Sequence, residues 1–160
     1  SGRLITDFVQ VAGKEATMLN IGMMGLLSAL LVVALNIQIN GPVIGAILTV
    51  MGFAAFGKHP LNSIPVVLGA ILAVLLTPIE LTLGPILAIF FVTGLAPLAG
   101  RFGFTAGVIA GFVHLLITPL ALSFQGGFDL YNNGFAAGFV AAVLSSLFLI
   151  IKPDTDERAI

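Results

Sequence analysis

Long apolar segments, separated by a few charged residues and by proline and glycine, dominate this sequence. A helix that crosses the hydrocarbon core of a bilayer needs roughly 20 apolar residues, with a range of about 17 to 25. Only 8% of the residues are charged and 59% are hydrophobic, whereas about a quarter of an ordinary soluble domain is charged. The chain therefore cannot cover its surface with polar side chains, and we expect an all-α, polytopic membrane protein. The six expected spans are residues 19–38, 42–57, 63–79, 84–100, 103–122 and 134–151.

Two of these segments, 42–57 and 63–79, are short, and we expect them to be tilted, broken or re-entrant. Before the first span, residues 1–18 carry apolar side chains at near-helical spacing, which is typical of a cytoplasmic interfacial helix. A linker fits the same residues equally well. The transmembrane domain then covers residues 19–151, and residues 152–160 form a polar cytoplasmic tail.

The basic residues all fall on one side of this topology if the N-terminus is cytoplasmic. The cytoplasmic positions are Arg3, Lys14, Lys58, Arg101, Lys152 and Arg158. The expected outer loops hold only acidic residues, Glu80 and Asp129. Because cytoplasmic loops carry an excess of lysine and arginine, the pattern predicts a plasma-membrane protein with both termini in the cytoplasm and with the lipid bilayer as its main surroundings.

Several function classes find no support in the composition. A net charge of −1 gives no reason to expect a nucleic-acid partner, and the absence of cysteine excludes a disulfide framework and a thiolate metal site. The histidines and carboxylates show no metal-ligand spacing, and no glycine-rich loop suited to phosphate is present. We therefore expect no enzyme activity, no cofactor and no metal.

An asparagine followed five residues later by a glycine begins three apolar segments, at Asn20, Asn40 and Asn133. Asparagine is a good helix N-cap, and Asn132 and Asn133 stand directly before the last span. Because five spans separate Asn20 from Asn133, the helices that they begin run in opposite directions, which predicts an inverted repeat. Capping and packing alone would also explain any single copy.

Glycines at four-residue spacing accompany these asparagines and continue along the fifth span. Small residues at this spacing mark the contact faces of helices in membranes. The glycines for which we expect helix packing are Gly41, Gly45, Gly103, Gly107, Gly111, Gly134 and Gly138.

The hexapeptide PLNSIP, residues 60–65, contains two prolines that we expect to interrupt a helix and to leave backbone carbonyl groups free. Asn62 and Ser63 can donate and accept hydrogen bonds there. The segment is either a rigid loop or part of a substrate path, because irregular backbone in a membrane is tolerated only inside protein or along a water-filled cavity.

Two ionisable residues are candidates for a site at membrane depth. His114 lies near the middle of the fifth span, where its ring needs a hydrogen-bond partner. It either lines a pore, relays a proton, or bonds to a neighbouring carbonyl group. Glu80 lies at the outer end of the third span and either faces water or stands at a pore mouth.

Two stretches resemble the signature motifs of urea transporters, whose halves are inverted five-span repeats. NGFAAG, residues 133–138, resembles the motif N-G-x-L-x-G, and PLNSIP resembles L-P-x-x-T-x-P-F. In the second stretch His59, Ser63 and Val66 stand where that family has leucine, threonine and phenylalanine. This resemblance implies the passage of a small amide.

The chain as a whole is similar to a bacterial membrane-protein family known as domain of unknown function 1576. The stretches FGKHPLNSIPVVLG and LYNNGFAAGFVA carry this similarity. It implies a protein of the bacterial inner membrane, and it brings no assigned activity.

These observations together predict a channel or facilitator for a small, polar, neutral solute, with urea-like amides favoured. The residues expected along its path are Asn20, Asn62, Ser63, His114, Asn132, Asn133 and Glu80. The alternatives are a proton-coupled secondary transporter that uses His114 or Glu80, and a non-transporting scaffold subunit. Because the second repeat has only just begun in the last span, we expect a homo-oligomer or a second homologous half as partner.

Overall fold

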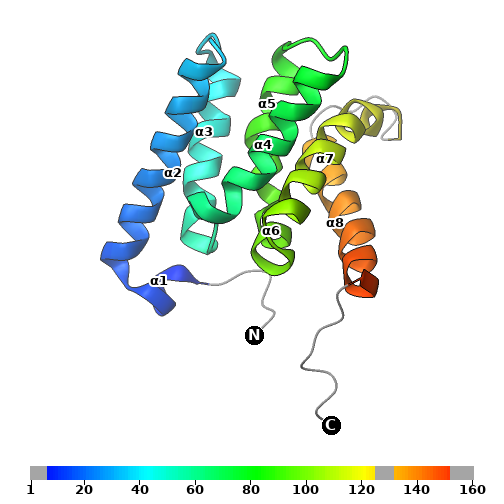
Figure 1. Ribbon diagram of the computed structural model, residues 1–160. Helices are drawn as coiled ribbons and strands as arrows, with labels where there is room; N and C mark the ends of the chain where they lie inside the picture. The colour runs from blue at the N-terminus through cyan, green and yellow to red at the C-terminus, as the bar shows by residue number, and fades with distance from the viewer. Residues whose placement is uncertain (1–6, 125–131, 152–160) are drawn as a thin grey trace.

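The computed structural model describes residues 7–124 and 132–151, and over these residues the secondary structure is helical throughout (Figure 1). The helices are α1 Phe8–Ala12, α2 Lys14–Ala34, α3 Gly41–Phe53, η1 Ala54–Phe56, α4 Pro60–Leu76, α5 Leu83–Phe91, η2 Val92–Leu95, α6 Ala96–Phe102, α7 Phe104–Phe124 and α8 Asn132–Ile151. The two η elements are short 3₁₀ helices. The prediction of an all-α fold is confirmed.

Four helical stretches within the described residues are long and apolar enough to cross a membrane. They are α2, the run Leu83–Phe102 that joins α5 to α6, α7 and α8. The stretches Gly41–Phe56 and Pro60–Leu76 are apolar but shorter. The expectation of an all-α chain with several helices of membrane-spanning length is therefore confirmed, whereas six complete spans and an inverted repeat stay predictions.

The pair α4 and α7 forms the centre of the molecule, with their backbones almost in contact (Figure 1). A Cβ atom added at Gly69 of α4 would overlap the carbonyl oxygen of Val108, and one added at Gly111 of α7 would overlap that of Val66. Glycine is therefore required at both positions, because any side chain would force the helices apart.

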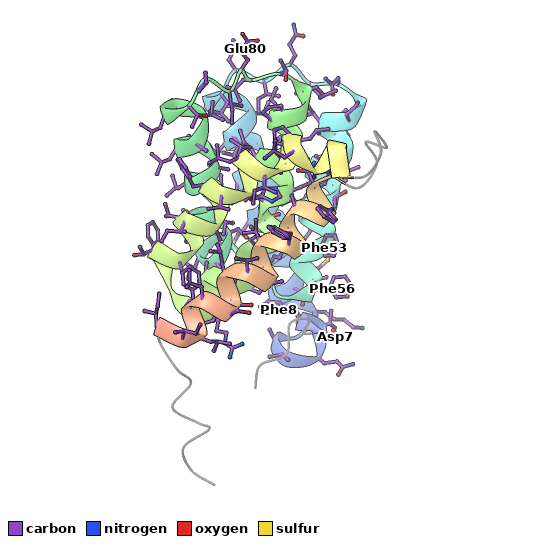
Figure 2. All side chains as sticks on the ribbon, turned by 90° about the vertical axis from the view of Figure 1, so that its right-hand side faces the viewer. Asp7, Phe8, Phe53, Phe56 and Glu80 are labelled. Atoms are coloured by element: carbon purple, nitrogen blue, oxygen red, sulfur yellow. The ribbon has the colours of Figure 1, made fainter. Side chains whose placement is uncertain are left out.

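The other helices are arranged around this pair. The α2–α3 hairpin lies on one side of it, and α8 packs against α7 on the other (Figure 1). The bent run α5–η2–α6 contacts both α4 and α7. Asp7 and Phe8, at the start of α1, lie at the end of the molecule opposite to Glu80 (Figure 2), and the last turn of α8 is also at that opposite end. This arrangement fits a single membrane-spanning bundle.

The first long helix begins earlier than predicted. Gly13, with a φ of 87°, separates α1 from α2, and α2 then starts at Lys14. Asn20 therefore lies well inside a helix, and the expectation that it caps one is wrong. Hydropathy marks where the apolar residues begin, whereas the helix also includes the polar turn before them. Asn40 does act as a cap, since its Oδ1 accepts a hydrogen bond of 3.0 Å from the backbone N–H of Val43 in α3.

The expectation that the prolines of PLNSIP interrupt a helix is also wrong, because α4 runs through both of them. Pro60 is in the first turn, where the missing N–H would have no helical partner in any case. Pro65 is deeper in the helix and fully buried. It packs beside Gly107 of α7, where an added Cβ would come within 2.7 Å of the proline ring. Tight packing against α7 thus holds the proline inside the helix.

The fourth predicted segment contains a feature that the apolar pattern does not reveal. The 3₁₀ turn η2 interrupts the α geometry between α5 and α6, and it contacts α4, α7 and α8. Stretches of 3₁₀ helix inside a longer helical run are common where a helix bends or is strained. The run therefore changes direction at the level where it meets α8.

Candidate functional site

The seven side chains predicted to line one path lie in three separate places: at the turn before α4 (Asn20, Asn62 and Ser63), on α7 and the first turn of α8 (His114, Asn132 and Asn133), and in the exposed loop between α4 and α5 (Glu80). Figure 2 shows Glu80 at one extreme end of the molecule, far from the turn near Phe53 and Phe56. The structure therefore does not bring the predicted residues into one continuous set.

Asn20 is buried and fastens α2 to the turn that follows η1. Its Nδ2 donates hydrogen bonds to the carbonyl oxygens of Ala54, at 2.9 Å, and Lys58, at 2.6 Å. The chain reverses direction here at Gly57, whose φ is 97°. A reversal leaves carbonyl groups with few helical partners. Asn20 supplies a donor to the carbonyl oxygen of Lys58 and a second donor to that of Ala54, which also accepts a hydrogen bond of 3.4 Å from the Gly57 N–H.

Asn62 and Ser63 organise the same turn from the side of α4. The Oδ1 of Asn62 accepts a hydrogen bond of 2.9 Å from the backbone N–H of His59, and its Nδ2 donates one of 3.1 Å to the carbonyl oxygen of Gly57. The hydroxyl of Ser63 donates to the same Oδ1 at 3.3 Å. The side-chain amides of Asn20 and Asn62 thus form hydrogen bonds with the polypeptide itself, and their role is to stabilise this turn.

Lys58 lies in this turn with its ammonium group 4.3 Å from the centre of the Phe53 ring. Burial lowers the pKa of Lys58 from 10.5 to about 8. The contact with the ring favours the charged form, whereas loss of water disfavours it, and the second effect is the larger. Burial also lowers the pKa of the neighbouring His59.

His114 is the fully buried polar side chain at the centre of the second group. It lies on α7, one helical turn before Thr118. The Thr118 hydroxyl donates a hydrogen bond of 2.8 Å to the backbone carbonyl of His114, and the same oxygen lies 3.4 Å from Nε2 of the imidazole ring. Thr118 therefore fixes one edge of the ring.

The other partner of the ring comes from α8. The Asn133 side chain interacts with the His114 imidazole, but neither Nδ1 of His114 nor Oδ1 of Asn133 reaches hydrogen-bond geometry with any group of the described residues. A buried polar atom without a partner costs about 1–3 kcal/mol, and polar groups in protein interiors are nearly always satisfied. Two such atoms in one contact between neighbouring helices are therefore a candidate binding site.

The position of α8 places this contact inside the bundle. The helix begins at Asn132, below the level of the loop that carries Glu80 (Figures 1 and 2). Asn133 is thus the second residue of the helix, and the expectation that it precedes the helix as its cap is wrong. Its side chain turns toward α7 instead. Asn132 is buried and has a partner of its own. The partially positive end of α8 consequently adjoins the His114–Asn133 pair.

The glycines predicted to pack helices divide into three kinds. Gly107 and Gly111 lie at the α4–α7 contact, where an added Cβ would meet atoms of the neighbouring elements. Gly103 links α6 to α7 with a φ of 95°. The remaining four have no neighbouring atom within 4 Å of an added Cβ: Gly41, Gly45, Gly134 and Gly138. Their faces point away from this chain, and the expected homo-oligomer or second half stays a prediction.

In the parts of the chain that the structure describes, no three histidine, aspartate or glutamate side chains come close enough together to hold a metal ion. At the contact between His114, Thr118 and Asn133 the groups are an imidazole, a hydroxyl and an amide, which bind through hydrogen bonds.

Comparison with known protein families identifies one relationship. Residues 1–150 match the family described as "Protein of unknown function (DUF1576)". The chain belongs to the DUF1576 family. Neither the curated proteins nor the solved structures gave a match. The sequence resemblance to this family is thereby confirmed, and the family adds no assigned activity.

Sequence reasoning missed three residues that shape this DUF1576 protein: Thr118, Gly69 and Lys58. The pairing of Thr118 with His114 could have been predicted from the sequence, because residues four apart lie on the same face of a helix. The close contact at Gly69 was not, since no second glycine at four-residue spacing accompanies it. The burial of Lys58 depends on how α3 and α4 pack, which a basic residue between two spans does not reveal.

Proposed function

We propose that this protein is a membrane facilitator for a small, polar, uncharged solute. His114 and Asn133 form the site within the bundle at which the solute binds. The observation that carries the proposal is the pair of buried polar atoms, Nδ1 of His114 and Oδ1 of Asn133, that lack a protein partner. A passing solute can supply the missing hydrogen bonds.

Two further features support the proposal. The first turn of α8 adjoins the pair, and helix ends that point into the membrane interior are a recurrent element of solute sites in transporters. In addition, the described residues of α7 and α8 contain no lysine, arginine, aspartate or glutamate. A site of neutral groups releases a solute more readily than a fixed charge does, because conduction requires weak binding.

A proton-coupled transporter is the second candidate, because His114 is a titratable group that is fully buried within a helix of membrane-spanning length. Glu80, the other residue considered for such coupling, is exposed in the α4–α5 loop. Of His114 and Glu80, only His114 would therefore couple proton movement to solute transport. A protonophore that abolishes uptake would favour this candidate over a passive facilitator.

The test is solute flux into proteoliposomes, followed by light scattering after an osmotic step. We expect urea and small amides to enter faster than into protein-free liposomes, and Asn133→Leu to remove most of the increase. Leucine has nearly the shape of asparagine but no hydrogen-bonding group. The matched control is Leu147→Ala on the same helix, at a side chain that is 46% exposed, and it should leave the flux unchanged. Equal flux in protein-containing and empty liposomes, across a panel of polar solutes, would instead indicate a scaffold subunit.

A further inference from the structure

The hydrogen bonds of Thr118 determine which nitrogen of His114 carries the proton. A threonine hydroxyl has a single hydrogen to donate, and that of Thr118 is directed to the His114 carbonyl oxygen at 2.8 Å. The same oxygen can then act toward the ring only as an acceptor. A hydrogen bond across the 3.4 Å between this oxygen and Nε2 then has its hydrogen on Nε2, and we assign this tautomer to His114.

With this tautomer, both of the buried atoms that lack a described partner are acceptors. In a neutral imidazole with its hydrogen on Nε2, the other nitrogen, Nδ1, is an acceptor. Nδ1 has no partner among the residues that the structure describes, and the same is true of Oδ1 of Asn133, which is also an acceptor. The two side chains are in contact. The pair thus presents two buried acceptors and lacks the donors that would satisfy them.

A species with two N–H donors on a single nitrogen matches this arrangement. An ammonium ion and an uncharged –NH₂ group both have them, but the partially positive N-terminus of α8 disfavours a cation beside Asn133. It favours the partially negative carbonyl oxygen that a primary amide carries next to its –NH₂ group. The partial positive charge at the start of α8 therefore favours a primary amide over an ammonium ion.

We propose that the His114–Asn133 pair selects solutes that carry an uncharged –NH₂ group, primary amides above all, and that it does so through two acceptors, Nδ1 of the ring and Oδ1 of the asparagine. This inference rests on the proposed function. It narrows the class of solutes from small polar molecules to molecules that donate two hydrogen bonds from one –NH₂ group. Solutes that offer only a carbonyl oxygen cannot donate a hydrogen to either of these two acceptors.

Nitrogen NMR of the histidine ring tests the inference directly, because the ¹⁵N chemical shift distinguishes a ring nitrogen that carries hydrogen from one that does not. His59→Asn leaves His114 as the only histidine and keeps a good capping residue before α4. This variant, labelled with ¹⁵N-histidine in lipid nanodiscs, is titrated with urea, acetamide and acetone. The three molecules are similar in shape, and they carry two, one and no –NH₂ groups.

We expect Nδ1 to be free of hydrogen, and its resonance to shift saturably with urea and with acetamide but not with acetone. Replacement of Asn133 by leucine in the same background should weaken the urea response about tenfold, the effect of one lost hydrogen bond. A hydrogen on Nδ1 would overturn the inference. An Nδ1 resonance that does not shift with urea would also overturn it, because Asn133 or another group would then already bind this nitrogen. A resonance that shifts with ammonium chloride but not with urea would overturn it as well.

The flux measurement separates this inference from the proposed function. If Asn133→Leu abolishes the flux while Nδ1 carries a hydrogen, the facilitator stands and the acceptor-based selection falls. If urea shifts the Nδ1 resonance while no solute crosses the membrane, the site binds amides and the facilitator falls.

Discussion

Asparagine side chains serve two different purposes in this protein. The amides of Asn20 and Asn62 bind backbone carbonyl oxygens of the turn between η1 and α4. That of Asn133 faces an imidazole ring and leaves its oxygen without a partner. The first arrangement contributes to the stability of the fold, whereas the second reduces it. Only the second therefore calls for a role outside the fold itself.

Removing the side-chain amide of Asn20 should destabilise the protein. Asn20→Leu leaves the carbonyl oxygen of Lys58 without this donor and that of Ala54 with the Gly57 N–H alone, and we expect the free energy of unfolding to fall by about 2 kcal/mol. Thermal unfolding in mild detergent measures this. Met18→Ala, at a side chain 70% exposed on the same helix, is the control and should change little. If Asn20 instead lines a solute path, the leucine variant would keep its stability and lose flux.

Stability should also depend on pH through Lys58. Burial lowers the pKa of this residue from 10.5 to about 8, so between these two pH values the unfolded chain binds more protons than the folded one. The free energy of unfolding then rises with pH across this window, by up to about 3 kcal/mol. Lys58→Met should be the more stable protein below pH 8 and should lack this rise. Parallel pH profiles of the two proteins would show that Lys58 is not buried.

At the scale of helices, the contact between α4 and α7 should tolerate no added carbon. Gly69→Ala places a Cβ against the Val108 carbonyl oxygen, and we expect a loss of about 3 kcal/mol or a failure to fold, because overlap with a backbone cannot be relieved by a side-chain rotation. Gly22→Ala is the matched control on α2. No atom lies within 4 Å of its added Cβ, so alanine should be neutral or stabilise by about 0.5–1 kcal/mol. Equal stability of the two variants would contradict the close approach of α4 and α7.

The existence of each helix could be predicted from the sequence, because a run of apolar residues with few charges has few alternatives to a helix in a membrane. The starts of α2 and α4 could not. Asn20 and Pro60–Pro65 were misread because capping and helix-breaking preferences are local rules, and contacts with distant residues override them. Asn20 binds residues 34 and 38 positions away, and Pro65 packs on another helix. Similarly, His114 was identifiable by its depth, but its contact with Asn133 depends on where α8 begins.

For the molecule as a whole, the positions of the charged residues predict its orientation. Arg101, in the last turn of α6, and Glu80, in the α4–α5 loop, lie at opposite ends of the bundle. The native chain has no cysteine, so single cysteines can be introduced without background. We expect an impermeant thiol reagent to label Glu80→Cys in intact cells and Arg101→Cys only after permeabilisation. The reverse pattern would invert the topology.

The close contact of α4 with α7 has a kinetic consequence. Since the backbones meet at Gly69 and Gly111, α7 cannot slide or tilt against α4 without steric overlap. The helix α8 packs on α7 through side chains instead, with Ala136, Val140 and Leu144 buried. If the proposed solute reaches the buried ring of His114 by displacement of α8, its entry depends on a helix motion, which takes about microseconds to milliseconds. A covalent tether between α7 and α8 would accordingly slow the entry and the exit of a solute by the same factor and leave its equilibrium affinity unchanged.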